Sequence, residues 1–560
     1  MLQCSMVMFH LLLVCLASLT ESEETCSADS SESSCHTKYA QFDFKGWELP
    51  LALYSNQLDE VTDVEVRVKF GSLPEYLHGS LYRVGPALYS LGGERRVNNL
   101  IDGLAKLHRW SFNKETGKVR VSSKFVRSDV YNRTIAAQEL PPIQYMGEIH
   151  PPLTTFEKLK ILFYDPPNDN TNVAVWDLGS LGVTTTTEQP RYIDNDYITL
   201  DFLREYVPPS WDKSLFEMEF LSASHFNRHP TTDASINYKI HLPFDMGIFS
   251  GKNSPAYHFY EYETDSVGEI VTKSLGYISV PSDDLRIVHS FGVTEHYVIL
   301  PRFNMFLDRK DPISIGANIY WDATRPTVFD ILSLETKETL SFKFNAYEAQ
   351  HIINSFEQQN SKGELEIVLD FPTRVYPVSF HEETVYDMLN VDKIKDPNWK
   401  QSEEEIRIND RARITRFVLN TVTGEGRDKD FPVMWNAPKY SGIEFPAINP
   451  NFRGVPYCFT YLQVSNRDLG GAMGIIKLDL CKEESIGWEE KNKFPVEPIF
   501  VPRPDSTDED DGVVMSPVLD STDNSTSLYI WNARNLEVIA IVDTPVIVPF
   551  TLHGLWFDGI

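Results

Sequence analysis

The stretch Phe329-Asp-Ile-Leu-Ser-Leu-Glu-Thr-Lys-Glu-Thr-Leu-Ser-Phe-Lys-Phe344 contains two short runs of strand-forming residues around a polar turn. Successive side chains of a β-strand point to opposite faces, so runs of this length and composition are typical of strands. The stretch therefore predicts a β-hairpin. Because similar stretches recur along the chain, hairpins of this kind indicate an all-β protein.

Comparable strand units lie on both sides of this hairpin, at Lys118–Val126, Ile414–Gly424, Gly474–Leu480, Leu528–Trp531 and Glu537–Asp543. Helical periodicity is limited to two short stretches, Phe156–Leu162 and Glu382–Val391. No long Gly/Ser-rich or Pro-rich linker divides the chain after about residue 40. Many hairpin-sized strands without a domain break predict an all-β fold and favour a β-propeller over a sandwich.

The composition limits the classes of partner. The chain has 560 residues, of which 42% are hydrophobic and 12% aromatic, enough for a large core. Its formal net charge is −29 at pH 7. Binding of nucleic acid needs a basic face for the phosphates, so we expect no nucleic-acid partner.

The N-terminus has the features of a secretory leader. An apolar run between Met6 and Ala17 is followed by small and polar residues, and it is too short to span a bilayer comfortably. We predict a signal peptide over residues 1–22, with an uncleaved anchor as the alternative, a flexible arm over 23–65 and one propeller domain over 66–560. The protein is then expected to be secreted or to lie in the lumen of the secretory pathway.

Removal of the leader leaves four cysteines, Cys26, Cys35, Cys458 and Cys481. An even number of cysteines in an oxidising compartment suggests two disulfides, for which three pairings exist. Local pairing of Cys26 with Cys35 and of Cys458 with Cys481 is the simplest.

Four histidines far apart in the chain stand in short distinctive settings. They read Ser-Ala-Ser-His225, Arg-Ile-Val-His289-Ser-Phe-Gly, Gln-His351-Ile-Ile-Asn354 and Pro549-Phe-Thr-Leu-His553-Gly554. Neutral imidazole is a ligand for Fe, Zn, Cu and Ni, and four that converge would hold one metal ion. Spacing alone cannot show that they converge, and a core histidine with satisfied hydrogen bonds is the alternative for each.

Three glutamates lie near apolar or proline-bounded segments: Glu188, Glu444 and Glu497. A carboxylate in such a setting needs a partner, and metal-bound histidines commonly donate their second N–H to a carboxylate. For each glutamate a purely structural hydrogen bond is an equal alternative.

A series of ordered motifs makes the chain similar to the carotenoid cleavage oxygenase family, from about Phe70 to the C-terminus. The motifs are Gly71-Ser-Leu-Pro-Glu-Tyr-Leu-His-Gly-Ser-Leu-Tyr-Arg-Val-Gly-Pro86, Ile101-Asp-Gly-Leu-Ala-Lys-Leu-His108, Val288-His-Ser-Phe-Gly292, His351-x-x-Asn354, Glu444-Phe-Pro446, Glu497-Pro-Ile-Phe500, Asp510-Asp-Gly-Val-Val514 and His553-Gly554. Each match alone is weak, and their common order makes the resemblance strong.

The resemblance implies a seven-bladed β-propeller with Fe(II) on its axis and a few short helices capping one face. His225, His289, His351 and His553 correspond to the iron ligands, and Glu188, Glu444 and Glu497 to the carboxylates that orient three of them. The implied activity is O2-dependent cleavage of a conjugated double bond in a carotenoid or apocarotenoid, giving carbonyl products of the retinal type. Since such substrates dissolve in lipid, peripheral membrane contact is also expected.

Two sets of alternatives stay open. The family usually has Ala-His-Pro-His at the first ligand, whereas Ser224-His225-Phe-Asn-Arg-His229 stands in this chain, so His229 is a rival for His225. A retinyl ester isomerohydrolase on the same iron scaffold and a non-catalytic secreted carotenoid-binding protein are the alternative functions.

Overall fold

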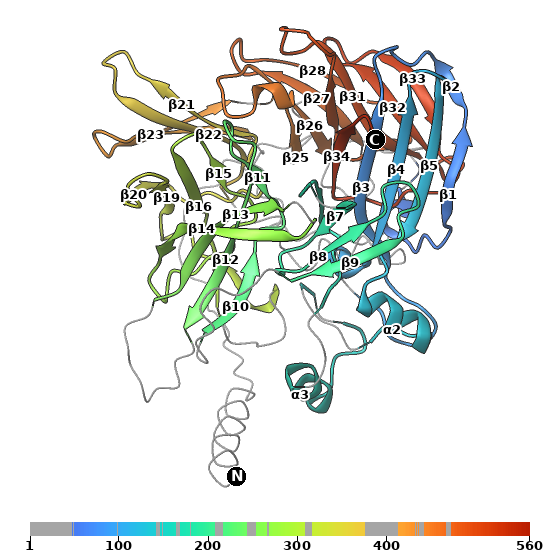
Figure 1. Cartoon of the computed structure of the whole chain (residues 1–560), viewed down its shortest axis with the longest axis horizontal. Coiled ribbons are helices and arrows are strands. Elements are labelled where there is room, and N and C mark those ends of the chain that lie inside the picture. The colour runs from blue at the N-terminus through green and yellow to red at the C-terminus, as the bar shows by residue number, and fades with distance from the viewer. Residues whose placement is uncertain are drawn as a thin grey trace, which may run out of the picture.

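The computed structural model describes residues 48, 50–97, 99–141, 146–147, 149–163, 168–179, 181–207, 217–243, 254–265, 268–308, 316–375, 413–431, 433, 435, 442–465 and 472–560. Nearly all of the regular structure in this part of the chain is β-sheet. Seven antiparallel sheets of four to six strands stand around a central axis, and a small two-stranded sheet accompanies them (Figure 1). The prediction of an all-β, seven-bladed propeller is confirmed.

The blades are numbered from the N-terminus, and the strands within each blade run in order from the axis outward. Blade 1 contains β34 (His553–Asp558), β3 (Gly79–Leu88), β4 (Leu104–Asn113), β5 (Lys118–Phe125) and β1 (Val61–Val66). Blade 2 contains β6 (Ala174–Trp176), β7 (Val183–Thr186), β8 (Tyr192–Asn195) and β9 (Phe202–Tyr206). Blade 3 contains β10 (Glu217–Ser222) and β11 (Asn227–Arg228), both on β12 (Ser235–Pro243), then β13 (Ala256–Thr264) and β14 (Ile270–Ser279).

Blade 4 contains β15 (Gly292–Val293), β16 (Tyr297–Arg302), β19 (Thr327–Ser333) and β20 (Thr339–Phe344), and β17 (Met305–Leu307) with β18 (Ile319–Trp321) forms the small sheet. Blade 5 contains β21 (Asn354–Gln359), β22 (Leu365–Thr373), β23 (Arg413–Asn420) and β24 (Gly426–Phe431). Blade 6 contains β25 (Gly442–Ala447), β26 (Phe459–Ser465), β27 (Met473–Asp479) and β28 (Glu484–Trp488). Blade 7 contains β29 (Lys493–Pro495) and β30 (Ile499–Pro502), both on β31 (Gly512–Asp520), then β32 (Ser525–Asn532), β33 (Val538–Asp543) and β2 (Val68–Gly71).

The two ends of the described chain close the ring. The C-terminal strand β34 pairs with β3 in blade 1, with His553 opposite Val84. Near the N-terminus, β1 completes the outer edge of blade 1, while β2 pairs with β33 in blade 7. Closure of this kind removes exposed inner edges and fixes the last strand, and with it His553, at the axis.

The hairpin predicted at Phe329–Phe344 is present. β19 and β20 pair in register from Thr327 opposite Phe344 to Leu332 opposite Thr339. On one face of the pair, Phe329, Ile331 and Phe342 are fully buried in a cluster between blades 4 and 5. In β20 only Phe342 and Phe344 are buried, so the alternation there reflects burial of one face, whereas β19 is buried on both faces.

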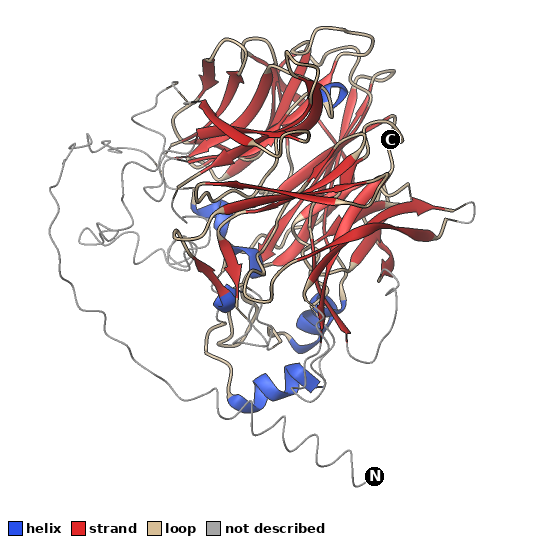
Figure 2. Ribbon diagram, turned by 90° about the vertical axis from the view of Figure 1, so that its left-hand side faces the viewer, coloured by secondary structure: helices blue, strands red, loops and turns tan. Residues whose placement is uncertain are grey.

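Few helices occur in the part of the chain that the structure describes; most lie toward one end of the sheets, and one short helix lies apart from them at the other end (Figure 2). The α-helices are α2 (Asp129–Ala137) and α3 (Thr155–Phe163), and the 3-10 helices are η1 (Leu51–Tyr54), η2 (Leu100–Asp102), η3 (Gly316–Asn318) and η4 (Pro450–Phe452). The helix predicted at Phe156–Leu162 is confirmed as α3. Helix α2 was not predicted, although Ser128 caps it by accepting from the Tyr131 amide.

Other predictions concern parts of the chain that are described only partly. Part of the segment 23–65, predicted as a flexible arm, is folded, because it contains η1 and the start of β1. The signal peptide, Cys26, Cys35 and the Glu382–Val391 helix lie outside the described residues and stay predictions. The predicted disulfide between Cys458 and Cys481 is present, with Cα atoms 5.2 Å apart. None of the described helices combines the length and the apolar character needed to cross a membrane.

Candidate metal centre

Each blade contributes one side chain to a cluster at the axis. His553 starts the inner strand of blade 1, and His225, His289 and His351 lie two or three residues before the inner strands β11, β15 and β21 of blades 3, 4 and 5. Blades 2, 6 and 7 provide three carboxylates, from Glu188, Glu444 and Glu497 in that order. The structure thus brings together all seven residues that the sequence singled out.

The four imidazole rings face one another through their Nε2 atoms. The Nε2 atoms of His225 and His289 are 3.1 Å apart, those of His289 and His351 also 3.1 Å, and those of His351 and His553 3.0 Å. All four ligand atoms lie within 4.8 Å of one another. Two imidazole nitrogens at about 2.1 Å from one ion, and about 90° apart, are about 3 Å from each other.

Three of the histidines are held from behind by a carboxylate. The distance from the ring Nδ1 to the carboxylate oxygen is 2.9 Å for His289 and Glu188, 2.6 Å for His351 and Glu444, and 2.8 Å for His553 and Glu497. Each of these rings donates its Nδ1–H to the carboxylate, so its Nε2 carries a lone pair toward the axis.

This arrangement tests whether a metal ion fits. Three Nε2 lone pairs meet at the axis without a proton of their own, so only a cation can make their close approach favourable. Extra protons are disfavoured, because burial and the neighbouring histidines lower the pKa of both His225 and His553 well below its usual range. A metal ion bound by imidazole fits the donor set, and the four histidines could hold one.

The carboxylates differ in their electrostatics. Burial alone would raise the pKa of Glu188, but the hydrogen bond from His289, the electrostatic attraction of that ring and the hydrogen bond from Ser224 outweigh it, and the pKa is lowered. Burial also opposes a low pKa for Glu444, which His351 and Arg374 nevertheless lower. For Glu497 burial dominates and raises the pKa to about 7, although Arg83 acts in the opposite direction.

The backbone next to Glu444 is adapted to the site. Phe445 has a left-handed conformation with φ of 57°, and the pairing of β25 with β26 shifts register between Glu444 and Ala447. Such strain and bulges occur where a side chain must be re-aimed. The Phe445 ring then packs 5.4 Å from the ring centres of both His351 and His553, which leaves little freedom for either imidazole.

His225 and not His229 belongs to the cluster. The Nδ1 atom of His229 accepts from the amides of Thr231 and Thr232, both at 3.2 Å, and its Nε2 donates to the Glu295 carbonyl at 3.0 Å. Both ring nitrogens of His229 are therefore used to stabilise a turn. His225 is the one member of the four for which no carboxylate partner is present among the described residues.

Arg83 is a member of the site that the sequence analysis missed. It lies on β3, is fully buried, and its Nη1 is 3.2 Å from the Glu497 carboxylate. A signal was present, because Arg83 lies within the first motif that resembles the family and alternation would place it inside a buried strand. A buried arginine needs a carboxylate partner, but nothing in the local sequence indicates which carboxylate provides it.

A cavity of about 790 Å³ leads from the histidines. His225, His351 and His553 line it, and so do Asp558 and Ile560 at the far end of β34. Trp176 and Phe500 contribute aromatic surface and Arg228 a charged group. The metal centre is therefore reachable by a ligand from that end of the propeller.

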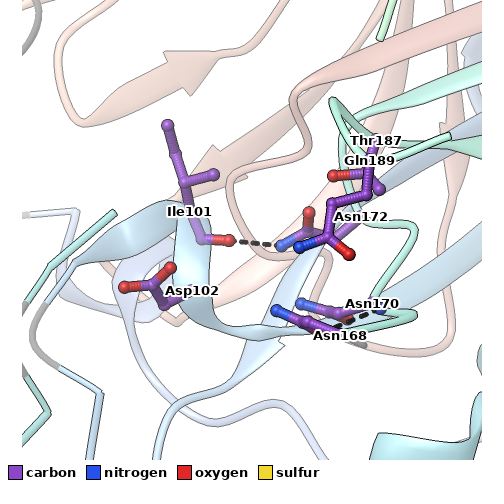
Figure 3. Close-up of a pocket in the computed structure, with 7 residues that line it drawn as sticks. All are labelled: Ile101, Asp102, Asn168, Asn170, Asn172, Thr187 and Gln189. Carbon is purple, nitrogen blue, oxygen red and sulfur yellow. Dashed lines mark hydrogen bonds between the residues drawn. The ribbon is translucent and has the colours of Figure 1, made fainter. Parts of the chain in front are cut away.

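A second, much smaller pocket lies beside Glu188 (Figure 3). Thr187 and Gln189, the neighbours of Glu188, line it together with Asp102 and Asn172, whose amide donates to the Ile101 carbonyl at 2.6 Å. Its volume of about 10 Å³ is sufficient for roughly one water molecule. This pocket is too small for a polyene, and polar side chains next to the segment that carries Glu188 line it.

Comparison with protein-family models gives a match over residues 54–558 to the family described as retinal pigment epithelial membrane protein. The chain belongs to this family. The match includes all four histidines, all three glutamates and Arg83.

Curated relatives in this family are similar over most of their length. The mitochondrial carotenoid-cleaving dioxygenase of Mustela putorius furo is 25% identical over 545 residues, covering 90% of this chain and 95% of the relative. The β,β-carotene 15,15'-dioxygenase of Gallus gallus is 27% identical and covers 87% of this chain and 94% of the relative. The chloroplastic carotenoid cleavage dioxygenase 8 of Arabidopsis thaliana is 25% identical, covering 94% of this chain and 86% of the relative.

Solved structures share the fold. A Synechocystis apocarotenoid oxygenase variant superimposes with a TM-score of 0.70 over 91% of this chain and 98% of its own, at 21% identity. A cobalt-substituted form of that oxygenase gives the same TM-score of 0.70. The similarity shows that this chain has the same propeller fold.

Proposed function

We propose that the protein is an Fe(II)-dependent dioxygenase that splits one conjugated double bond of a carotenoid or apocarotenoid. The observation that carries the proposal is the four-histidine centre with three carboxylate supports, found in a chain of this family and open to a large cavity. One alkene and one O2 give two carbonyl products, so each fragment keeps one oxygen atom and no further reductant is needed.

The residues of the cluster have separable roles in this proposal. Four imidazole groups bind the ion, and Glu188, Glu444 and Glu497 fix the orientation of three of them. Four protein ligands leave positions open at an ion that accepts six, which is what O2 and substrate need. Fe(II), when bound, supplies the chemistry with O2 that no side chain of the cluster can supply.

Charge balance supports a divalent ion. With four neutral imidazoles, and with Glu188, Glu444 and Glu497 all ionised beside a bound cation, the three carboxylates and the Arg83 guanidinium leave a net charge of −2. A second guanidinium near Glu444, that of Arg374, has its own carboxylate partner in Glu348 at 3.6 Å. A divalent cation would therefore neutralise the buried cluster although the four groups bound directly to it are neutral.

The test is metal analysis of the purified protein, followed by incubation with β-carotene in air and under argon and chromatography of the products. We expect about one iron per chain and aldehyde products that form only with O2. In a parallel incubation with a retinyl ester, hydrolysis to retinol under argon would indicate the isomerohydrolase instead. Bound pigment without metal would overturn the enzyme proposal in favour of a carotenoid-binding protein.

We also propose that the protein enters the secretory pathway and contacts a membrane peripherally to take up its apolar substrate. The Cys458–Cys481 disulfide supports an oxidising compartment. Phe156 on α3, at 77%, is the most exposed large apolar side chain in the described part of the chain and is therefore the first candidate for membrane contact. Recovery of the protein in culture medium tests secretion. Membrane contact predicts that the protein co-sediments with phosphatidylcholine vesicles and that a Phe156→Ser variant does not.

A further inference from the structure

Arg83 makes four polar contacts in the interior of the propeller. Its Nη1 donates to the carbonyl of Glu497 at 3.0 Å and lies 3.2 Å from the Glu497 carboxylate. Its Nε donates to the hydroxyl of Thr551 at 2.8 Å, and its Nη2 lies 3.5 Å from the Thr551 carbonyl. One guanidinium thus joins β3 to two segments of the metal centre, the one with Glu497 and the one that leads into His553.

These contacts fix the Glu497 carboxylate from the side opposite His553. One oxygen, Oε1, faces Nδ1 of His553 at 2.8 Å. The other, Oε2, accepts from the Gly554 amide at 2.8 Å and faces Arg83. With both oxygens held, the carboxylate cannot rotate, and the plane of the His553 ring is fixed with it.

The fork of arginine is needed for this geometry. A guanidinium presents its N–H groups in one rigid plane, whereas the ammonium of lysine is a compact point charge on a flexible stem. A lysine at position 83 could keep a positive charge near Glu497, but it could not also reach the Thr551 hydroxyl and the Glu497 carbonyl in one plane. Charge and shape at this position can therefore be separated by mutation.

We propose that Arg83 is a positioning residue of the metal centre, which acts on the ion through Glu497 and His553. It has two effects: it orients the His553 ligand, and its charge reduces the net charge around the ion from −3 to −2, which suits a divalent ion. This inference rests on the proposed metal centre and adds a residue and a role to it.

The first experiment measures the affinity of metal-free protein for Co(II), by competition with a chelator, and the visible spectrum of the Co(II) form. We expect Arg83→Lys to weaken binding about 10- to 100-fold, as is typical of groups behind a ligand, and to change the spectrum. Arg302→Lys is the matched control, because Arg302 is also buried and also paired with carboxylates, Asp284 and Asp330, neither of which contacts a histidine of the cluster. Its Co(II) affinity and spectrum should equal those of the wild type.

The second experiment asks whether Arg83 acts through Glu497. In a double-mutant cycle the loss caused by Arg83→Lys should be largely absent in a Glu497→Gln background, since the group that it positions is already uncharged. Equal losses in both backgrounds would mean that Arg83 acts on the metal centre by another route.

The third experiment isolates the charge. We expect the reduction potential of bound iron to be lower in Arg83→Met than in Arg83→Lys, because a net charge of −3 stabilises the ferric ion. Should Arg83→Met fail to fold, Thr551→Val removes one contact of the same guanidinium and should weaken Co(II) binding severalfold, with the unfolding temperature of the metal-free protein measured alongside.

The outcomes separate this inference from the proposed function. If the wild type binds no Co(II), Zn(II) or Fe(II), the metal centre itself is overturned. If the wild type binds metal and Arg83→Lys binds it within about twofold with an unchanged spectrum, or if Arg302→Lys weakens binding as much, only the role of Arg83 is overturned.

Discussion

Two buried clusters of charged and polar residues in this propeller use the same carboxylate chemistry to different ends. In blade 4, Asp284 and Asp330 are paired with Arg286 and Arg302, with 2.7 Å between Arg302 Nε and Asp330 and between Arg286 Nη2 and Asp284. At the axis, three carboxylates are instead paired with the Nδ1–H groups of histidines. Both sets of carboxylates are satisfied, and both clusters are buried or nearly so.

The two clusters differ in the group that pairs with the carboxylate, a guanidinium in blade 4 and an imidazole at the axis. A guanidinium carries donors only, so the blade 4 cluster leaves no acceptor without a donor. An imidazole that donates through Nδ1 becomes an acceptor at Nε2, so the axial cluster ends in acceptors that face one another at about 3 Å. A metal site arises where the fold accumulates acceptors, and a structural ion cluster arises where donors and acceptors match.

The largest effect is expected for removal of one acceptor at the axis. His289→Ala deletes a ligand and leaves Glu188 without its ring partner, so we expect the variant to retain no stoichiometric metal. Metal analysis after reconstitution with Fe(II) measures this. A fully loaded His289→Ala protein would contradict the assignment of the axial cluster as a metal site.

In blade 4 we expect a substitution to lower the stability of the protein and to leave its metal affinity unchanged. Arg302→Met leaves Asp284 and Asp330 with a buried charge that has lost a partner, which typically costs about 3–5 kcal/mol of stability. The free energy of unfolding should fall by this amount while Co(II) affinity stays within about twofold of the wild type. A fall in metal affinity of more than tenfold would show that the two clusters are coupled, and the comparison would fail.

A substitution that removes only one charge at the axis, Glu444→Gln, can be compared directly with Arg302→Met in blade 4. Glu444→Gln keeps the size of the side chain but replaces the anion behind His351 with a neutral amide. We expect metal affinity or activity to fall roughly 10- to 100-fold. Stability of the metal-free protein should change little in comparison with Arg302→Met, and unchanged affinity would remove Glu444 from the metal site.

Much of the fold was open to prediction from the sequence because its signals are local. The strand-forming runs in Phe329–Phe344 and Lys118–Val126 predict strands whether one face or both faces are buried, and β19, β20 and β5 are present there. Helix α2 was missed because its nine residues mix polar and apolar types and most of its surface is exposed. Ring closure was implied only by the family resemblance, since no local pattern pairs β34 with a strand that begins at Gly79.

The site could be predicted only in part, for a related reason. The histidines and glutamates were found through motifs, each of which lies on a different blade, and their convergence depends on the closed ring. Arg83 was missed because a charged residue within an apolar strand motif gives no local indication of a partner 414 positions away. The same holds for Asp102, whose carboxylate accepts from the amides of Met146 and Gly147 at 3.0 and 2.8 Å.

The smallest effect on stability is expected for Asp102, which is a third kind of buried carboxylate beside those of blade 4 and of the axis. Its carboxylate is held by two backbone amides and not by a histidine or an arginine. Burial raises its pKa from 3.8 to about 6, against the two amides, whereas histidines keep the pKa of Glu188 and Glu444 low. Between pH 4 and 6 the folded protein therefore binds more protons at this group than the unfolded chain, and stability from this group falls as the pH rises. In Asp102→Asn, which does not titrate, this loss is absent, so the free energy of unfolding of the wild type relative to the variant should fall by on the order of 2 kcal/mol from pH 4 to pH 7. Measured on metal-free protein, the difference cancels every other titrating group. A difference that is constant with pH would mean that Asp102 stays ionised in the fold, and that backbone amides alone can hold a buried carboxylate as well as the histidines do.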